Sequence, residues 1–379
     1  MRFLATCVWG AFLCSCSDPG TLGASQMERR ELGMIDYGRT GESVAPYYVV
    51  RPASAAELSV VVVEAHRLKK KLRIRGRGHS MNQSSLPRKG EISLDTSGLN
   101  YYEFDSPGTV RVGAGVPMTD IDELVRGYGM SLPVLNDGGR GPSLGGYVAA
   151  GGIGRGATVH GGFWANVLQL VVVSGSGEIL VIDRTDPLFP WFFGSMGRLG
   201  VVAEARLQLV AENQVTQPYP VGASGRIDVR SASARVDADE NLFWLTVFAP
   251  VVDRKRLRER LESLMARHSE SANFTEIYEY RIASADVVAP LVYPEPGEFA
   301  AMGVWGSVRP GGERFRKLFA LSDAIDHLLR EEPGWRRYVQ TEAVRPSFDH
   351  LEYFGPRVGP VFALLESSLD PHQVLNPRN

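Results

Sequence analysis

The apolar residues between positions 54 and 68 recur with the spacing of an α-helix. Ser54 precedes this run and Glu57 follows three residues later, which is the pattern of a capping box and marks where the helix begins. The pattern therefore predicts a helix that runs to about Leu68 and buries one face. The residues expected on that face are Leu58, Val61, Val62 and Ala65.

Short runs rich in branched and aromatic residues predict strands on both sides of this helix. These runs are Tyr48–Arg51, the neighbourhood of Leu72 and Ile74, Glu91–Asp95 and Thr109–Gly115. Helical spacing returns from Met118 to Tyr128, and Gly129 gives a stop signal. Two more β-rich runs, Val167–Val173 and Glu178–Asp183, flank a Ser-Gly-Ser-Gly turn and predict a hairpin. This alternation of strands and helices predicts an α+β unit.

The pattern changes after about Ala211. Strand-like runs then alternate with long amphipathic helices, which predicts a second unit of strands covered by helices. Its expected elements are Asn241–Phe248 and Phe274–Arg281 as strands, and Asp253–His268 and Glu313–Arg330 as helices. A further helix is expected to end at about Ser368.

Charge and cysteine content exclude several classes of function. The formal net charge of the 379-residue chain is −2, so there is no electrostatic case for binding nucleic acid. All three cysteines, Cys7, Cys14 and Cys16, lie in the first sixteen residues. This leaves no disulfide framework, cysteine metal site or catalytic thiol in the rest of the chain. The histidines show no metal-binding spacing, so we expect no metal site.

The N-terminus has the layout of a secretory signal peptide: Arg2, an apolar run from Phe3 to Leu13, and then small residues. The segment Leu13–Cys16 is similar to a bacterial lipoprotein cleavage box, which would allow membrane attachment through a lipid on Cys16. We therefore expect export to the periplasm or the medium. The alternative is a cytoplasmic protein with an uncleaved tail or an upstream start codon.

Two glycine-dense stretches suggest a phosphate-binding site. The first, Arg73–Ser80, follows a predicted strand and holds Gly76 and Gly78, which let backbone N–H groups face inward and form an anion-binding concavity. The second runs from Gly138 to Gly161. Either could be an ordinary turn, but together they could enclose one elongated cofactor. Residues 152–157 also fit a dinucleotide fingerprint, but that motif needs a strand before it and a long helix after it, and both are missing here.

These motifs resemble the FAD enzymes of the vanillyl-alcohol oxidase / p-cresol methylhydroxylase type, and most closely the cytokinin dehydrogenases. Arg75–Ser80 matches their Arg-Gly-x-Gly-His-Ser loop, and Asp36–Arg39 is similar to their Asp-Phe-Gly segment with Tyr for Phe. The resemblance runs without an obvious gap from Gly145 to Leu209 and returns in the tail at Asp370–Pro377. It implies that His79 carries the flavin covalently.

The resemblance also implies a domain order and a fold class. The expected fold is α+β, a two-part FAD-binding domain with an inserted α+β substrate-binding cap. In residue numbers, the signal peptide takes 1–20, a linker 21–34, the first part of the FAD domain 35–210, the cap 211–345 and the C-terminal return 346–379.

The residues expected to bind FAD by this resemblance come from four parts of the chain. They are Arg75, Gly76, Arg77, Gly78, His79, Ser80, Gln83, Gly145, Gly146, Gly151, Gly152, Gly156, His160, Gly200, Val201, Val202 and Asn376. His160 is more easily read as structural than as catalytic. Gln83 lies where relatives tend to carry Gly or Gly-Gln.

The chemistry implied is transfer of a hydride from a substrate C–H to flavin N5, with oxygen or a quinone as the final electron acceptor. For a cytokinin-type amine the product imine is hydrolysed to an amine and an aldehyde. Asp137 is the candidate proton acceptor, although Asn136-Asp137-Gly138 is equally typical of a turn. Of Glu276 and Glu279 at most one can face the site, and we select Glu279. The alternatives are an oxidase of alcohols, sugars or lactones, or a non-catalytic FAD- or ligand-binding lipoprotein.

Overall fold

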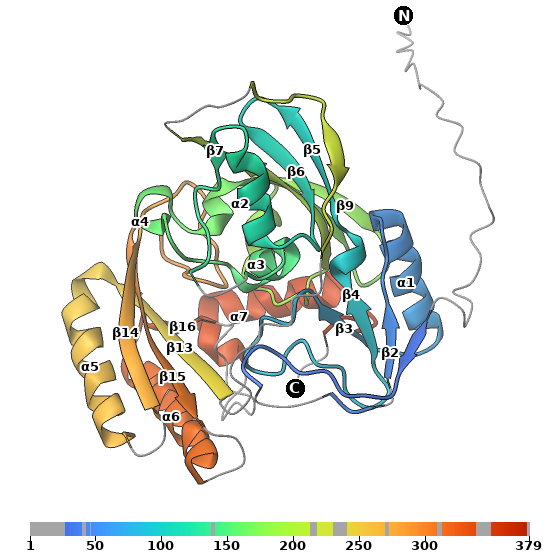
Figure 1. Cartoon of the computed structure of the whole chain (residues 1–379). Helices are drawn as coiled ribbons and strands as arrows, with labels where there is room; N and C mark the ends of the chain where they lie inside the picture. The colour runs from blue at the N-terminus through green and yellow to red at the C-terminus, as the bar shows by residue number, and fades with distance from the viewer. Residues whose placement is uncertain are drawn as a thin grey trace, which may run out of the picture.

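The computed structural model describes residues 27–39, 43–45, 47–137, 141–212, 218–229, 241–269, 273–308, 313–338 and 350–376. The expected signal peptide, with Cys16, and residues 21–26 of the expected linker lie outside these ranges. Helices and sheets are mixed, as an α+β fold requires, and three main sheets follow one another along the chain (Figure 1). Among the described residues, no helix has the length and apolarity needed to cross a membrane.

The first sheet has the strand order β1-β2-β4-β3 and is covered by α1. Helix α1 (Ala55–Arg67) begins as predicted, because the Ser54 side chain accepts a hydrogen bond from the Glu57 N–H at 3.2 Å. Its apolar stripe is buried at the four expected positions. The strands are β1 (Glu28–Arg30), β2 (Tyr47–Val50), β3 (Leu72–Arg75) and β4 (Ile92–Asp95).

The second sheet has six strands in the order β12-β5-β6-β10-β8-β9. The predicted hairpin is present as β8 (Val167–Val173) and β9 (Ile179–Asp183). The other strands are β5 (Tyr101–Ser106), β6 (Thr109–Gly113), β10 (Val201–Gln208) and β12 (Ser224–Arg226). The helices of this part are α2 (Met118–Arg126), α3 (Leu144–Ala150) and α4 (Ala157–His160), and a small pair joins β7 (Met130–Ser131) to β11 (Val210–Ala211).

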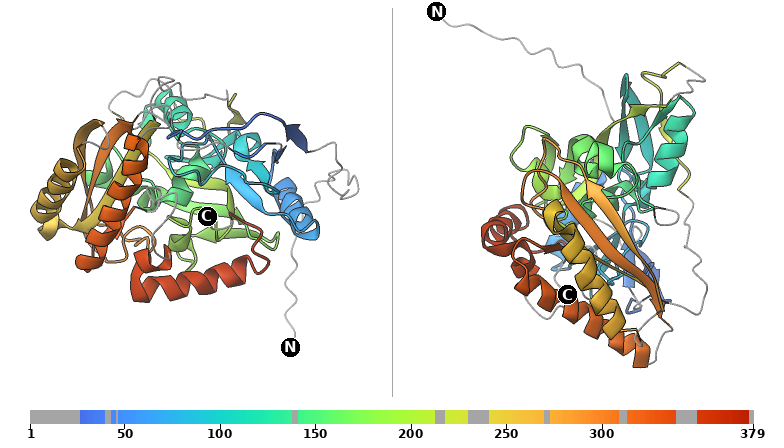
Figure 2. Two further views of the ribbon diagram at one scale, coloured as in Figure 1. Left: turned by 90° about the horizontal axis from the view of Figure 1, so that it is seen from below. Right: turned by 90° about the vertical axis from the view of Figure 1, so that its left-hand side faces the viewer.

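The third sheet has the order β14-β15-β13-β16 and its own core. Helices α5 (Arg254–Arg267) and α6 (Glu313–Glu331) pack their apolar residues on one face of it, and Figure 2 shows α5 lying along the strands. The strands are β13 (Asn241–Pro250), β14 (Asn273–Ile282), β15 (Phe299–Val308) and β16 (Arg336–Arg337). The opposite face joins the large core of the first two sheets through Phe248, Phe299 and Tyr338.

The chain then returns to the first sheet. Helix α7 (His350–Leu369), red in Figure 1, runs from the third sheet back toward β3. After it, the Leu72 N–H donates to the Val374 carbonyl at 2.8 Å and the Asn376 N–H donates to the Leu72 carbonyl at 2.9 Å. The buried Asp370 carboxylate accepts from the N–H groups of Val374 and Leu375, both at 2.8 Å, which fixes the tail. The C-terminal segment is thus part of the same folded unit as β3.

Candidate functional site

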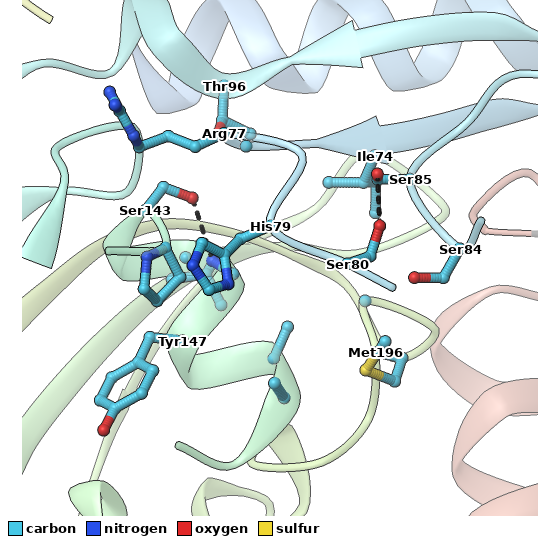
Figure 3. A pocket seen from close by; sticks show the side chains of 18 of the residues that line it. Ile74, Arg77, His79, Ser80, Ser84, Ser85, Thr96, Ser143, Tyr147 and Met196 are labelled. Carbon is cyan, nitrogen blue, oxygen red and sulfur yellow. Dashed lines mark hydrogen bonds between the residues drawn. The ribbon is translucent and has the colours of Figure 1, made fainter. Parts of the chain in front are cut away.

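A pocket lies where four loops meet: the one after β3, the one before and into α3, the one before β10, and the C-terminal tail (Figure 3). Glycine backbone, serine and threonine hydroxyls, one arginine and several apolar side chains make up its lining. The residues that line it are Ile74, Gly76, Arg77, Gly78, His79, Ser80, Ser84, Ser85, Thr96, Pro142, Ser143, Gly145, Gly146, Tyr147, Ala149, Ala150, Met196, Gly197, Gly200, Val201, Val202 and Asn376.

Glycine is required in the loop after β3 because neighbouring side chains occupy the space of a Cβ. A Cβ on Gly76 would overlap the hydroxyl of Ser143, which caps α3 by accepting from the Gly146 N–H at 3.3 Å. Gly78 has a φ of 66°, and its missing Cβ leaves room for the Arg75 guanidinium. The loop therefore approaches α3 closely and presents its backbone to the pocket.

The tail closes another side of the pocket through one amide side chain. Asn376 accepts a hydrogen bond from the Ile74 N–H at 2.8 Å and donates from Nδ2 to the Met196 carbonyl at 2.6 Å. It thereby ties β3 to the loop before β10. Ser80 and Ser85 share a hydrogen bond of 2.7 Å across the neighbouring loop (Figure 3).

Eleven of the residues expected to bind the cofactor line this pocket: Gly76, Arg77, Gly78, His79, Ser80, Gly145, Gly146, Gly200, Val201, Val202 and Asn376. The other six expected residues lie behind it. Arg75 is half-buried beside Gly78, and desolvation lowers its pKa although nearby Asp36 and Asp95 work against this. The Gln83 N–H donates to Asp36 Oδ2 at 2.8 Å.

The remaining glycines and His160 support the second loop structurally. Gly151 ends α3 in the left-handed region, with φ at 69°. A Cβ on Gly152 would overlap the Tyr147 ring, and one on Gly156 would overlap the Pro133 carbonyl. The backbone carbonyl of His160 accepts from Asn166 Nδ2 at 3.1 Å. Sequence reasoning assigned these positions to the cofactor because glycine used for packing and glycine used for binding look the same.

Asp137 lies beside the third sheet, where the Tyr280 hydroxyl donates a hydrogen bond to its carboxylate. Burial raises the pKa of Tyr147 well above its ordinary value, and Tyr338, Asp137 and Tyr280 add to this by their charges. Asp137 and Tyr280 do not line the pocket, but their charges act on Tyr147, which does.

Glu279 is placed elsewhere, and the prediction for it is corrected. Its carboxylate pairs with Arg254 and Arg258 of α5. Successive side chains of a strand point to opposite faces, so Glu279 faces the helices while Tyr280 faces Asp137. The side chain of Glu276, the other carboxylate considered, lies outside the described residues.

The face of the third sheet that carries Tyr280 is aromatic. The rings of Trp244 and Trp305 stack at 5.5 Å, and Tyr338 meets Trp244 edge-on at 5.3 Å. Tyr278 lies beside Tyr280 with ring centroids 5.6 Å apart. Burial raises the pKa of the Tyr278 phenol well above its ordinary value, so it stays neutral at physiological pH. We call this set (Trp244, Tyr278, Tyr280, Trp305 and Tyr338) the aromatic wall.

One arginine belongs to the same face. Arg336 is partly buried, and burial lowers its pKa. Its Nη1 donates to the Trp335 carbonyl at 2.8 Å, and its Nε has no hydrogen-bond partner among the described residues. A Cβ on Gly355 would lie 3.3 Å from its Nη2, so the guanidinium reaches toward α7. Within the described ranges, no three His, Cys, Asp or Glu side chains converge as a metal site.

Comparison with known proteins identifies the part of the chain that forms most of the pocket. Residues 46–183 match the family described as FAD binding domain. The donor set of the pocket fits this cofactor. The backbone of six lining glycines, the hydroxyls of Ser80, Thr96 and Ser143 and the guanidinium of Arg77 are the donors that a pyrophosphate needs, and the imidazole of His79 lies at the edge.

The relatives agree with this match at modest identity. The chain is 30% identical over 178 residues to cytokinin dehydrogenase 2 of Arabidopsis thaliana, which is 46% of this chain and 35% of the relative. It is 28% identical over 187 residues to an uncharacterized oxidoreductase of the fasciation locus of Rhodococcoides fascians, which is 48% of this chain and 42% of the relative. It is 26% identical over 186 residues to a D-lactate dehydrogenase of Archaeoglobus fulgidus, which is 46% of this chain and 42% of the relative.

The matches thus span less than half the length of these relatives. They agree with the resemblance expected from the glycine-rich loops. Residues 46–183 thus match the FAD binding domain family, and the chain is similar to cytokinin dehydrogenases and to other dehydrogenases and oxidoreductases.

Proposed function

We propose that this protein is an FAD-dependent oxidoreductase that oxidises a C–H beside a secondary amine on a planar substrate, as a cytokinin dehydrogenase does. The observation that carries this proposal is Asp137, a carboxylate that accepts a hydrogen bond from Tyr280 of the aromatic wall. A flat ring system packs well against aromatic faces, and an amine N–H needs one acceptor. FAD when bound supplies the two-electron acceptor for the oxidation.

In this proposal each group of residues has one task. The glycine and serine backbone with Arg77 holds the pyrophosphate, and His79 tethers the ring system covalently. Asp137 accepts the N–H proton of the substrate, and the phenol of Tyr280 fixes the direction of the carboxylate. The third sheet and its covering helices act as a substrate cap that keeps water from this end of the pocket. Oxygen or a quinone then takes the electrons.

A second candidate has one observation in its favour. Arg336 offers a partly buried cation on the same face as the aromatic wall, and cations of this kind bind carboxylates and polar oxygen-rich substrates. This would suit a hydroxy acid, sugar, alcohol or lactone. The guanidinium reaches toward Gly355 of α7, whereas Tyr280 contacts Asp137, so the two substrate classes would occupy different ends of the wall.

The tether is tested by acid precipitation of the purified protein. We expect the yellow colour to stay with the wild-type pellet and to move to the supernatant in the His79→Ala variant. His160→Ala is the matched control, because His160 lies outside the pocket lining, and its colour should stay in the pellet. Release of flavin from the wild type would refute the tether, and absence of any flavin would refute the whole proposal.

The substrate class is tested by anaerobic bleaching of the bound flavin. Isopentenyladenine should bleach the absorbance, whereas D-lactate, a γ-lactone and a polyol should not. The reverse pattern would replace the amine proposal by the second candidate, with loss of bleaching in Arg336→Gln as its confirmation. Bound flavin that no donor bleaches would favour the non-catalytic binding protein.

We also propose that the protein is exported, from the apolar run Phe3–Leu13 and the cysteine that follows it. Cell fractionation with mass analysis of the mature N-terminus tests this. A membrane-bound form that begins at a lipid-modified Cys16, and that becomes soluble in Cys16→Ser, is the expected result. An intact N-terminus in the cytoplasmic fraction would exclude export.

A further inference from the structure

A short N-terminal segment, residues 35–38, lies against the loop that carries His79. The Tyr37 N–H donates to the Gly78 carbonyl at 2.8 Å, and the Gly38 N–H donates to the Ser80 carbonyl at 3.3 Å. These two bonds bracket His79 from either side. The segment therefore contacts the backbone of the His79 loop at two points, although it lies about forty positions earlier in the chain.

Tyr37 contacts the functional ring itself. The rings of Tyr37 and His79 are stacked, with centroids 4.4 Å apart and planes inclined by 15°. His79 lines the pocket and Tyr37 does not, so the phenol supports the imidazole from the side away from the pocket. Burial raises the pKa of Tyr37, so the supporting ring is a neutral phenol at physiological pH.

A half-buried arginine and a buried aspartate hold this segment in place. Arg75 lies beneath Gly78 and donates from Nη2 to the Ile35 carbonyl at 3.0 Å and from Nη1 to the Ser85 hydroxyl at 3.3 Å. Asp36 is only 3% exposed and accepts from the Gln83 N–H at 2.8 Å, at the far end of the same loop. Breaking the Asp36 contact would leave a buried charge poorly solvated, and the Arg75 contacts hold the other end of the segment.

Stacking on Tyr37 restricts the rotation of the His79 ring. The loop sets the position of the His79 Cα, but the imidazole can still rotate about its side-chain bonds. Parallel stacking on Tyr37 fixes the plane of the ring. Alignment of a reacting group contributes strongly to the rate of bond formation, because misplacement by about 1 Å can cost on the order of a hundredfold.

We propose that Tyr37 is a positioning residue that orients the His79 imidazole for its covalent attachment to the flavin. In this step the imidazole gives up its N–H proton and forms one N–C bond to the 8α carbon of the cofactor. One C–H proton leaves that carbon, and the two electrons released pass through the cofactor to dioxygen. This inference rests on the proposed covalent tether, and it assigns to residues 35–38 a role in forming that tether.

The experiment measures covalent and total FAD separately in the full-length protein. Tyr37→Phe keeps the stacked ring, Tyr37→Leu keeps apolar bulk without a planar face, and Tyr37→Ala removes both. Tyr48→Ala is the matched control, since Tyr48 is 43% exposed on β2 and lies outside the pocket lining. Each variant is incubated with FAD in air, denatured in acid at fixed times, and divided into pellet and supernatant flavin.

We expect Tyr37→Phe and Tyr48→Ala to attach flavin at the wild-type rate. Tyr37→Leu and Tyr37→Ala should attach it about tenfold more slowly or less completely while still binding FAD without the bond. Covalent attachment at the wild-type rate in Tyr37→Leu would overturn the inference while leaving the tether intact. Equal loss of bound and covalent FAD would also overturn it, because Tyr37 would then act on binding. Release of all flavin by the wild type would refute the tether as well.

Discussion

The two ends of the site differ in the residues that line them. At the cofactor end, backbone groups of glycine-rich loops and a few hydroxyls line the pocket, and side chains contribute little bulk. At the proposed substrate end, the third sheet contributes large aromatic side chains, and Asp137 meets them through its hydrogen bond with Tyr280. A pocket made of backbone constrains the sequence to glycine at fixed spacing, whereas a wall of side chains can be changed one residue at a time.

This contrast explains why the cofactor was easier to infer than the substrate. The FAD match ends at residue 183, before the third sheet begins. The relatives named cytokinin dehydrogenase and D-lactate dehydrogenase match over similar shares of this chain. One cofactor-binding frame can therefore serve different substrates, and substrate choice must be argued from the third sheet.

The largest effect we expect tests whether the third sheet can be destabilised without loss of flavin from the pocket. Arg337 and Asp326 form an ion pair that is 1% and 0% exposed, between β16 and α6. Asp326→Ala removes the carboxylate that neutralises a buried arginine, which should cost about 3–5 kcal/mol of stability. Calorimetry should show a lower unfolding temperature, while acid precipitation of the folded protein still finds flavin in the pellet.

The matched control is Glu331→Gln, on the same helix. Glu331 pairs with Arg260 at the surface, and the two side chains are 65% and 44% exposed. Such pairs contribute about 0–1 kcal/mol, so this variant should unfold close to the wild type. Loss of flavin from the Asp326→Ala variant at temperatures where it remains folded would show that the two ends are one cooperative structure.

The next effect separates proton transfer from cofactor binding. Asp137→Asn keeps the size of the side chain but removes the base, so the rate of flavin bleaching by isopentenyladenine should fall by about a hundredfold. The covalent flavin content should not change, because Asp137 does not line the cofactor pocket. Stopped-flow absorbance measures the first quantity and acid precipitation the second.

Glu279→Gln serves as the comparison for that variant. Its carboxylate faces α5, so bleaching should proceed at the wild-type rate. A fall as large as that of Asp137→Asn would return Glu279 to the site and contradict its assignment to the helix-facing side of β14.

A smaller effect tests whether FAD binding requires glycine in the loop after β3. Gly78 and Gly90 both have positive φ, 66° and 86°, so alanine at either costs about 1–2 kcal/mol of backbone strain. Only Gly78 has a neighbour that the new Cβ would overlap, the Arg75 guanidinium, whereas nothing lies within 4 Å of Gly90. In a His79→Ala background, where FAD is not tethered, Gly78→Ala should therefore weaken FAD binding by about tenfold beyond Gly90→Ala, which equilibrium dialysis can measure. Equal affinities would mean that the loop tolerates a side chain.

Much of the fold could be predicted from local patterns. Helix α1 and the β8–β9 hairpin formed where the apolar spacing and the turn residues placed them. The central strand of the third sheet, β15, was missed. Its Ala300, Ala301 and Gly303 are poor strand formers, and they are needed there because a Cβ on Gly303 would overlap the Tyr278 ring. The requirement comes from a neighbouring strand, which local reasoning cannot see.

The site was predictable to a similar extent. The two glycine-rich loops do meet in one pocket, as their chemistry suggested. Ser143 was missed, although its place before a helical run that contains glycine is the signal of an N-cap. The stack of Tyr37 on His79 joins residues far apart in the chain and has no signature in spacing. The choice between Glu276 and Glu279 depended on which face of β14 each side chain occupies, and a shift of one residue along the strand reverses that assignment.

The smallest effect we expect distinguishes a structural carboxylate from a catalytic one. Burial works to raise the pKa of the Glu279 carboxyl, but hydrogen bonds and charges from Arg254 and Arg258 outweigh it and hold the pKa below its ordinary value of 4.5. A carboxyl with a lowered pKa stabilises the folded state above its unfolded pKa, and this contribution is lost as the pH falls through the folded value. Glu279→Gln should thus reduce stability by about 0–1 kcal/mol at neutral pH, because both arginines are exposed to salt and solvent. The difference from the wild type should shrink as the pH falls below 4.5, which paired calorimetric scans at neutral and acid pH would detect. A difference that grows on acidification would reverse the sign of the pKa shift and mean that the arginines do not hold this carboxylate.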